Sequence, residues 1–215
     1  MPEEVAATAA GWSDPRLERW LDAVVSTPGL TGIGEAGEAR RVHVADALAA
    51  LALLELGPVV DVGSGGGSPG IPLAAARPDL DFVLLEASAR KCRFLETWAR
   101  EFPNSSVVCA RAEEHAAAAG REAYGAAVAR ALAPPPVALE WCLPLVTVGG
   151  LCVLYTGAPE LERLAEVARR LGGSEPEARP VAGSEQRHLV LVRKLTPTPF
   201  GFPRRPGLAR KRPLA

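Results

Sequence analysis

The chain has 215 residues, enough for one α/β domain with a small appendage and a sizeable buried core. Hydrophobic residues make up 48 % and charged residues 23 %, as in ordinary globular proteins, and no apolar stretch is long enough to span a bilayer. The charge is uneven: Gln186 to Ala215 contains eight Lys or Arg and no acid, so all 25 acidic residues precede it. This asymmetry favours a polyanionic partner, with a merely solvated tail as the alternative.

Hydrophobic periodicity predicts helices that alternate with strands after an all-helical beginning. The expected helices cover residues 14–26, 38–57, 71–76, 89–102, 112–119, 135–146 and 159–173. The expected strands cover residues 59–62, 81–87, 106–109, 126–132, 150–157 and 186–195. Such alternation predicts an α/β fold with a mostly parallel, doubly wound sheet and N-terminal helices. We expect a helical segment at 1–57, a central domain at 58–195 and a basic C-terminal arm at 196–215.

The four cysteines, at positions 92, 109, 142 and 152, are scattered and include no Cys-x-x-Cys pair. This spacing favours buried thiols in a reducing cytosol over a disulfide or a metal site. No metal site is therefore expected, and the acidic N-terminus shows no secretory signal.

A glycine-rich stretch, VVDVGSGGGSPGIPLA, follows the first expected strand and contains five glycines between Gly63 and Gly70. A turn needs one or two glycines, so this number indicates a ligand that lies against bare backbone. GGGSPG fits a dinucleotide fingerprint by spacing, although Pro69 is awkward there, and the absence of Gly-Lys-Ser/Thr excludes a triphosphate loop.

The alternative pattern is an acid followed by alternating glycines, here Asp61, Gly63, Gly65 and Gly67, which is common in enzymes that use S-adenosylmethionine. Glu86 ends the second strand, where a carboxylate can accept both ribose hydroxyls, or else cap the next helix. Ala112 and Glu113 follow the third strand, where they would meet the adenine.

The stretches DVGSGGGSPGIPLA, LLEASARKCRFL, ARAEEH, ARALAP and RHLVLVRKLTPTPFGFPRRPGLARKRPL resemble the bacterial 16S rRNA guanine-N7 methyltransferases, also called glucose-inhibited division protein B. The resemblance runs from about Arg41 to the C-terminus. It implies a Rossmann-like S-adenosylmethionine-dependent methyltransferase fold and a guanine of the small ribosomal subunit as methyl acceptor.

Carried over by position, the resemblance implies cofactor contacts at several residues: Gly63, Ser68, Glu86, Ala112, Glu113 and Arg130. His43 and Asp46 match a family His-x-x-Asp motif, although His43 is expected to serve packing or hydrogen bonding. Three residues depart from the family pattern, namely Ala47 for serine, Gly125 for aspartate and Thr156 for lysine.

Attack by N7 of guanine on the methyl group needs no general base, because this nitrogen carries a free lone pair. Positioning alone can therefore drive the transfer, and Arg130 is expected to hold either the cofactor carboxylate or an RNA phosphate, unless it forms an ordinary salt bridge. The tail supplies phosphate-binding candidates: Arg204, Arg205, Arg210, Lys211 and Arg212.

The resulting prediction is a cytoplasmic, monomeric enzyme that methylates N7 of a guanine in 16S rRNA, on free RNA or the small subunit. Two alternatives remain open. One is a diverged methyltransferase for another RNA or a small molecule, and the other is a non-catalytic RNA-binding protein.

Overall fold

The computed structural model describes residues 14–184 and 186–215, and the first part of the expected N-terminal segment lies outside them. Seven strands form one sheet in the order β3-β2-β1-β4-β5-β7-β6. The strands are β1 (Val59–Val62), β2 (Phe82–Glu86), β3 (Ser105–Cys109), β4 (Tyr124–Arg130), β5 (Val146–Thr156), β6 (Glu177–Pro180) and β7 (His188–Arg193). The first five pair in parallel, and β7 runs antiparallel to both of its neighbours. The mostly parallel, doubly wound sheet is thus confirmed.

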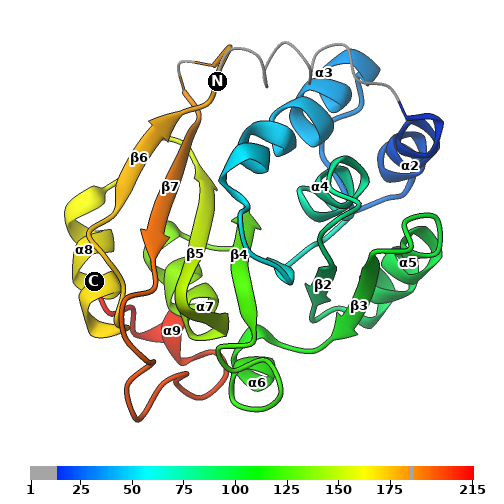
Figure 1. Cartoon of the computed structure of the whole chain (residues 1–215). Coiled ribbons are helices and arrows are strands. Elements are labelled where there is room, and N and C mark those ends of the chain that lie inside the picture. The colour runs from blue at the N-terminus through cyan, green and yellow to red at the C-terminus, as the bar shows by residue number, and fades with distance from the viewer. Residues whose placement is uncertain (1–13, 185) are drawn as a thin grey trace.

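Helices cover both faces of the sheet (Figure 1). They are α2 (Pro15–Ser26), α3 (Ala36–Arg40), α4 (Gly70–Ala76), α5 (Ala89–Ala99), α6 (Ala112–Ala116), α7 (Pro135–Cys142), α8 (Leu161–Arg170) and α9 (Leu208–Lys211). Val59 packs with α2, α4 and α5 in one core cluster, whereas Val60 packs with α7 and α8 in the other. Because neighbouring residues of a strand point to opposite faces, the apolar run of β1 is buried on both sides.

The N-terminal helices pack directly onto the sheet. Asp14 caps α2 by accepting a hydrogen bond from the Arg16 amide, and the apolar stripe of α2 includes the fully buried Trp20. The indole Nε1 of Trp20 donates to the carbonyl of Gly66 over 2.9 Å. Helix α2 therefore anchors the glycine loop that follows β1.

The expected regular helix at 38–57 is wrong in its winding. After α3 the chain forms a π-helical turn, η1 (Arg41–Ala45), and then a 3-10 helix, η2 (Ala47–Leu53). The carbonyls of Val42 and His43 accept side-chain hydrogen bonds from β4 and from the glycine loop, and that of Ala47 accepts one from β5. Tertiary partners thus replace part of the i→i−4 ladder, as in other π turns near functional sites.

Two further expectations need correction. Cys92 and Cys109 form a disulfide, because α5 folds back against β3 and brings their Cα atoms to 5.8 Å; Cys142 and Cys152 are buried thiols as expected. The short strand β6 was not expected, since it is largely exposed and contains few apolar residues. Within the described residues, no helix is long and apolar enough to cross a membrane.

Candidate active site

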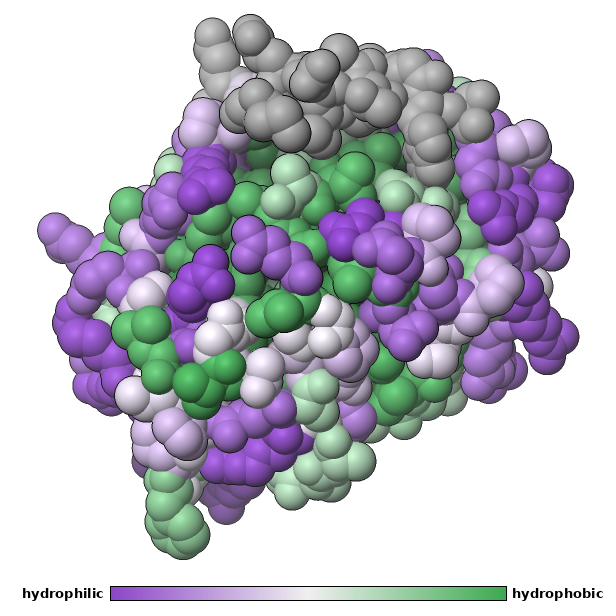
Figure 2. All heavy atoms as spheres, in the orientation of Figure 1, coloured by the Kyte–Doolittle hydropathy of each residue, from purple (hydrophilic) through white to green (hydrophobic). Residues whose placement is uncertain are grey.

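A pocket of about 770 Å³ opens at the carboxyl ends of β1 and β4. These two strands are neighbours at the centre of the sheet, where the strand order reverses and α/β proteins bind their ligands. In the orientation of Figure 1, apolar residues gather across the middle of the face that Figure 2 shows, with polar residues around and among them. The volume is large enough for a nucleoside cofactor with a second group beside it.

The glycine loop forms the floor of the pocket, which includes Gly63, Ser64, Gly65 and Gly66. Gly63 has a φ of +73°, and a Cβ added to it would lie 2.3 Å from Cδ1 of Leu132. The bend therefore requires glycine both for its backbone conformation and for its close approach to the segment after β4.

Glu86 holds this loop from beneath. Its Oε2 accepts a hydrogen bond from the Gly65 amide at 3.0 Å and its Oε1 accepts one from the Ser88 amide at 2.8 Å. The carboxylate is 8 % exposed. Each oxygen keeps a second lone pair, so Glu86 can also accept the hydroxyls of a ribose that lies on the loop.

Asp61 holds the loop from its other end and, like Glu86, is not among the residues that line the pocket. Its Oδ2 accepts a hydrogen bond from the Gly70 amide, and burial raises the pKa of the carboxyl to about 7. Gly67 is also a supporting residue, because a Cβ there would lie 2.5 Å from Cδ1 of Ile71. The sequence correctly predicts that Asp61 and Gly67 belong to the glycine loop and its approach, but both residues face the core and not the pocket.

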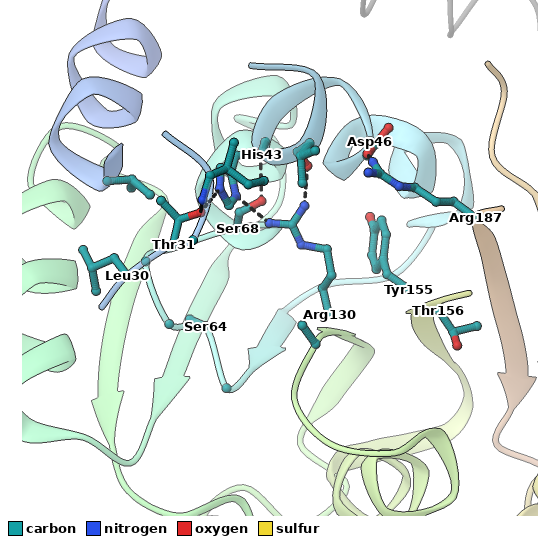
Figure 3. A pocket seen from close by; sticks show the side chains of 18 of the residues that line it. Leu30, Thr31, His43, Asp46, Ser64, Ser68, Arg130, Tyr155, Thr156 and Arg187 are labelled. Atoms are coloured by element: carbon teal, nitrogen blue, oxygen red, sulfur yellow. Dashed lines mark hydrogen bonds and ion pairs between the residues drawn. The ribbon is translucent and has the colours of Figure 1, made fainter. Parts of the chain in front are cut away.

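Arg130 reaches the pocket from the end of β4, and Figure 3 shows its guanidinium pointing toward His43. It donates to the carbonyl of Val42 and, over 2.8 Å, to Nδ1 of His43. Burial lowers the pKa of Arg130, and none of the ion pairs found in the described chain gives it a carboxylate partner. Within the described residues no ordinary salt bridge is found for Arg130, which leaves the guanidinium available to an anionic group.

His43 links three walls of the pocket. Its Nδ1 accepts from Arg130, so its Nε2 carries the proton and donates to Oγ1 of Thr31 over 2.9 Å. Ser68 donates to the His43 carbonyl over 2.8 Å. Burial, and then the Arg130 charge, lower the pKa of His43 to about 4, which keeps the ring neutral. The expected hydrogen-bonding role of His43 is confirmed.

Ala131 follows Arg130 with a φ of +53° and lines the same pocket. A non-glycine residue in this left-handed region costs about 1–3 kcal/mol and persists only where the surroundings hold it. The turn after β4 thus carries strain where it meets the pocket, which is typical of a functional turn.

Ala112 and Glu113 do not line the pocket. Glu113 is buried at the start of α6, and its Oε1 accepts a hydrogen bond from the Gly207 amide in the C-terminal arm. The arm therefore occupies the carboxylate that the resemblance assigns to the cofactor.

The arm is docked onto the protein along much of its length. Arg204 forms a bidentate pair with the buried Glu140, and the Arg210 guanidinium lies 5.2 Å from the centre of the Trp141 ring. Of the five basic candidates, Arg205, Lys211 and Arg212 remain exposed without an ion pair to the described residues. These three can reach an RNA phosphate without breaking a contact of the fold.

The structure also brings residues to the pocket that the sequence did not single out. Thr31 arrives from the connection after α2, Tyr155 from β5, and Arg187 from the segment before β7, where it forms an ion pair with Asp46. Arg187 is the first residue of the RHLVLV stretch of the resemblance, which was the available signal. The three residues that depart from the family pattern lie in different surroundings. Thr156 lines the pocket, and the carbonyl of Ala47 accepts a hydrogen bond from Tyr155. Gly125 lies outside the pocket, where an added Cβ would be 2.5 Å from the Leu56 carbonyl.

The fold and this site define a Rossmann-like S-adenosylmethionine-dependent methyltransferase. Solved structures agree on the fold: the methyltransferase domain of citrinin polyketide synthase matches with a TM-score of 0.59 and 8 % identity, covering 83 % of this chain and 60 % of that one. Precorrin-6y C5,15-methyltransferase from Geobacter metallireducens matches with a TM-score of 0.53 and 18 % identity, covering 80 % of this chain and 95 % of that one.

The family follows from sequence comparison. The family model described as rRNA small subunit methyltransferase G matches residues 16–190. Ribosomal RNA small subunit methyltransferase G from Moorella thermoacetica is 38 % identical over 86 % of this chain and 82 % of its own length. The protein of that name from Rubrobacter xylanophilus is 41 % identical over 80 % and 72 %. The chain belongs to the rRNA small subunit methyltransferase G family.

Proposed function

We propose that this protein transfers the methyl group of S-adenosylmethionine to N7 of a guanine in 16S rRNA of the small ribosomal subunit. The observation that carries the proposal is the glycine loop clamped by Glu86 beside Arg130, which has no ion pair to a described residue, in a chain of this family. The cofactor, the RNA partner, a cytoplasmic location and a monomeric state are parts of the same proposal.

The residues present fit the proposed cofactor. Its sulfonium supplies an activated methyl group that a neutral nitrogen can attack. Gly63 and Gly65 offer backbone without side chains against which a nucleoside can lie, and Glu86 has lone pairs left for ribose hydroxyls. Arg130 can bind the carboxylate of the methionine part through a charge-assisted hydrogen bond.

The protein's contribution to the reaction is positioning. N7 of guanine holds no proton, so none of the pocket residues needs to act as a general base. Neutral His43 keeps Arg130 aimed into the pocket. Holding reactants in line can contribute about 7–11 kcal/mol at the favourable limit.

The test is to map 7-methylguanine in 16S rRNA by mass spectrometry, in a strain with and without this gene. Loss of one modified guanine on deletion, and its return when purified protein and labelled cofactor are added to the mutant's subunits, are expected. An unchanged methylation pattern would overturn the proposal.

A second function, a non-catalytic RNA-binding protein, predicts no affinity for S-adenosylmethionine. Calorimetry separates the two functions directly. Measurable binding that is lost in Glu86→Ala is the result expected here.

A further inference from the structure

Asp46 and Arg187 face each other at the pocket, on the side of Arg130 away from Ser64 in the view of Figure 3. Asp46 stands at the junction of η1 and η2, and Arg187 lies just before β7. Their side chains form an ion pair through Oδ2 of Asp46 and Nη1 of Arg187.

Asp46 is 8 % exposed, and its fully buried Oδ2 is the oxygen that Nη1 of Arg187 contacts. Within the described residues, Arg187 is the one partner found for its side chain. A buried carboxylate commonly fills its lone pairs with N–H donors. The other oxygen of Asp46, Oδ1, has no hydrogen-bond donor among the described residues, and Asp46 lines the pocket.

Oδ1 of Asp46 has two lone pairs and lies beside the Arg187 guanidinium, so the pair offers two acceptor positions next to a set of donors. The matching partner has two neighbouring N–H donors followed by a carbonyl. Guanine presents that order on its Watson–Crick edge, with N2–H, N1–H and O6. Adenine has one donor beside an acceptor nitrogen there, and neither cytosine nor uracil has two neighbouring donors.

The reacting atom also dictates which edge is read. The commonest arginine contact to guanine is bidentate to O6 and N7, and it would occupy the lone pair that must attack the methyl group. A methyltransferase acting at N7 therefore has to recognise the base from its other edge, as enzymes that extrude a base generally do.

We propose that Asp46 and Arg187 form the base-reading subsite of the acceptor, which rests on the function proposed above. Asp46 accepts N1–H and N2–H of guanine, and Arg187 donates to O6 while staying beside the carboxylate. Neither the buried carboxylate nor the half-buried guanidinium is then left unpaired when the base is bound.

The experiment compares guanosine with inosine, which keeps N7, N1–H and O6 but lacks the N2 amino group. Small subunits are reconstituted from ligated 16S rRNA that carries either nucleoside at the mapped position. Labelled methyl transfer gives kcat/KM for each particle with the wild type, Asp46→Asn and the control Asp22→Asn. The control makes the same chemical change on the exposed face of α2.

The wild type and Asp22→Asn should prefer guanosine by about ten- to a hundredfold, the discrimination of one good base contact. Asp46→Asn should lower this ratio toward one, with an unchanged affinity for S-adenosylmethionine in calorimetry. Arg187→Gln should slow transfer to both particles equally, because both nucleosides carry O6.

Equal rates of the wild type on the two particles would overturn the subsite, with no variant needed. A wild-type ratio retained in Asp46→Asn would overturn it as well. Absence of transfer to the guanosine particle would defeat the proposed function itself, and is thereby distinguished from a failure of the subsite alone.

Discussion

Nη2 of Arg130 lies 2.8 Å from Nδ1 of His43, so a half-buried arginine donates to a histidine that must be neutral. Protonation of His43 would place two cations in contact. Burial and the Arg130 charge accordingly lower the pKa of His43 from 6.5 to about 4. At a pH between about 4 and 6.5, the folded state therefore binds fewer protons than the unfolded state.

The first prediction is a loss of stability in mild acid that depends on His43. Below pH 6.5 unfolding lets His43 bind a proton that the folded protein does not accept until the pH is near 4. The free energy of unfolding is therefore unaffected by His43 above pH 6.5 and falls between pH 6.5 and 4, by at most about 3 kcal/mol. Urea unfolding at pH 7.5, 6.0 and 5.0 measures the change. His43→Asn, which keeps an acceptor for Arg130 but does not titrate, should lose less stability over the same range. Equal slopes for the two proteins would contradict the prediction.

The second prediction concerns Arg130 and the cofactor. Arg130→Lys keeps a positive charge but cannot donate to Val42, to His43 and to a ligand carboxylate in one planar geometry. The affinity for S-adenosylmethionine should fall by about ten- to a hundredfold, since a hydrogen bond to a charged group contributes about 1.5–3 kcal/mol. Calorimetry measures it, with the exposed Arg93→Lys on α5 as control. Unchanged affinity would place the carboxylate elsewhere.

The sequence predicted the sheet and the loop because their signals are local. The apolar run of β1, the glycines after it and Glu86 at the end of β2 follow each other at short separations, and the structure brings them together as expected. The bend at Gly63 could be inferred from its residue type alone.

The other half of the site depends on contacts between distant segments, which no local pattern encodes. Asp46 meets Arg187 across 141 positions, and Arg130 meets His43 across 87. The π turn of η1 forms because distant side chains take its carbonyls, which composition does not reveal. Glu113 and Arg204 are similar cases. Glu113 was expected to bind the cofactor and Arg204 to bind RNA, but each instead makes a contact that fixes the C-terminal arm to the domain.

The third prediction separates two costs at Gly63. Gly63→Ala should be destabilising by its positive φ, about 1–2 kcal/mol, and further by the approach of the new Cβ to Leu132. Gly201→Ala shares a positive φ, +90°, but meets nothing within 4 Å, so it carries the first cost alone. Urea unfolding should show the larger loss for Gly63→Ala, and adding Leu132→Ala should recover part of the difference. Equal losses at the two glycines would show that the contact with Leu132 carries no cost.

The final prediction divides the basic residues of the arm by their contacts. Glu140 is 2 % exposed and its charge is matched by Arg204, so Arg204→Ala leaves a buried carboxylate unpaired. Breaking such a pair costs about 3–5 kcal/mol, which thermal or urea unfolding will register. The triple change of Arg205, Lys211 and Arg212 to alanine removes three exposed charges and should leave stability nearly unchanged.

The same triple variant should bind RNA with a salt dependence reduced by about two in the log–log slope, from about 0.7 for each phosphate contact to a single strand. Filter binding at salt concentrations from about 50 to about 200 mM gives this slope for the wild type and for the variant. If the slope stays the same, these three residues make no phosphate contacts, and the RNA must approach over another face. If the triple variant instead unfolds as readily as Arg204→Ala, the exposed residues belong to the fold in the same way as Arg204 does.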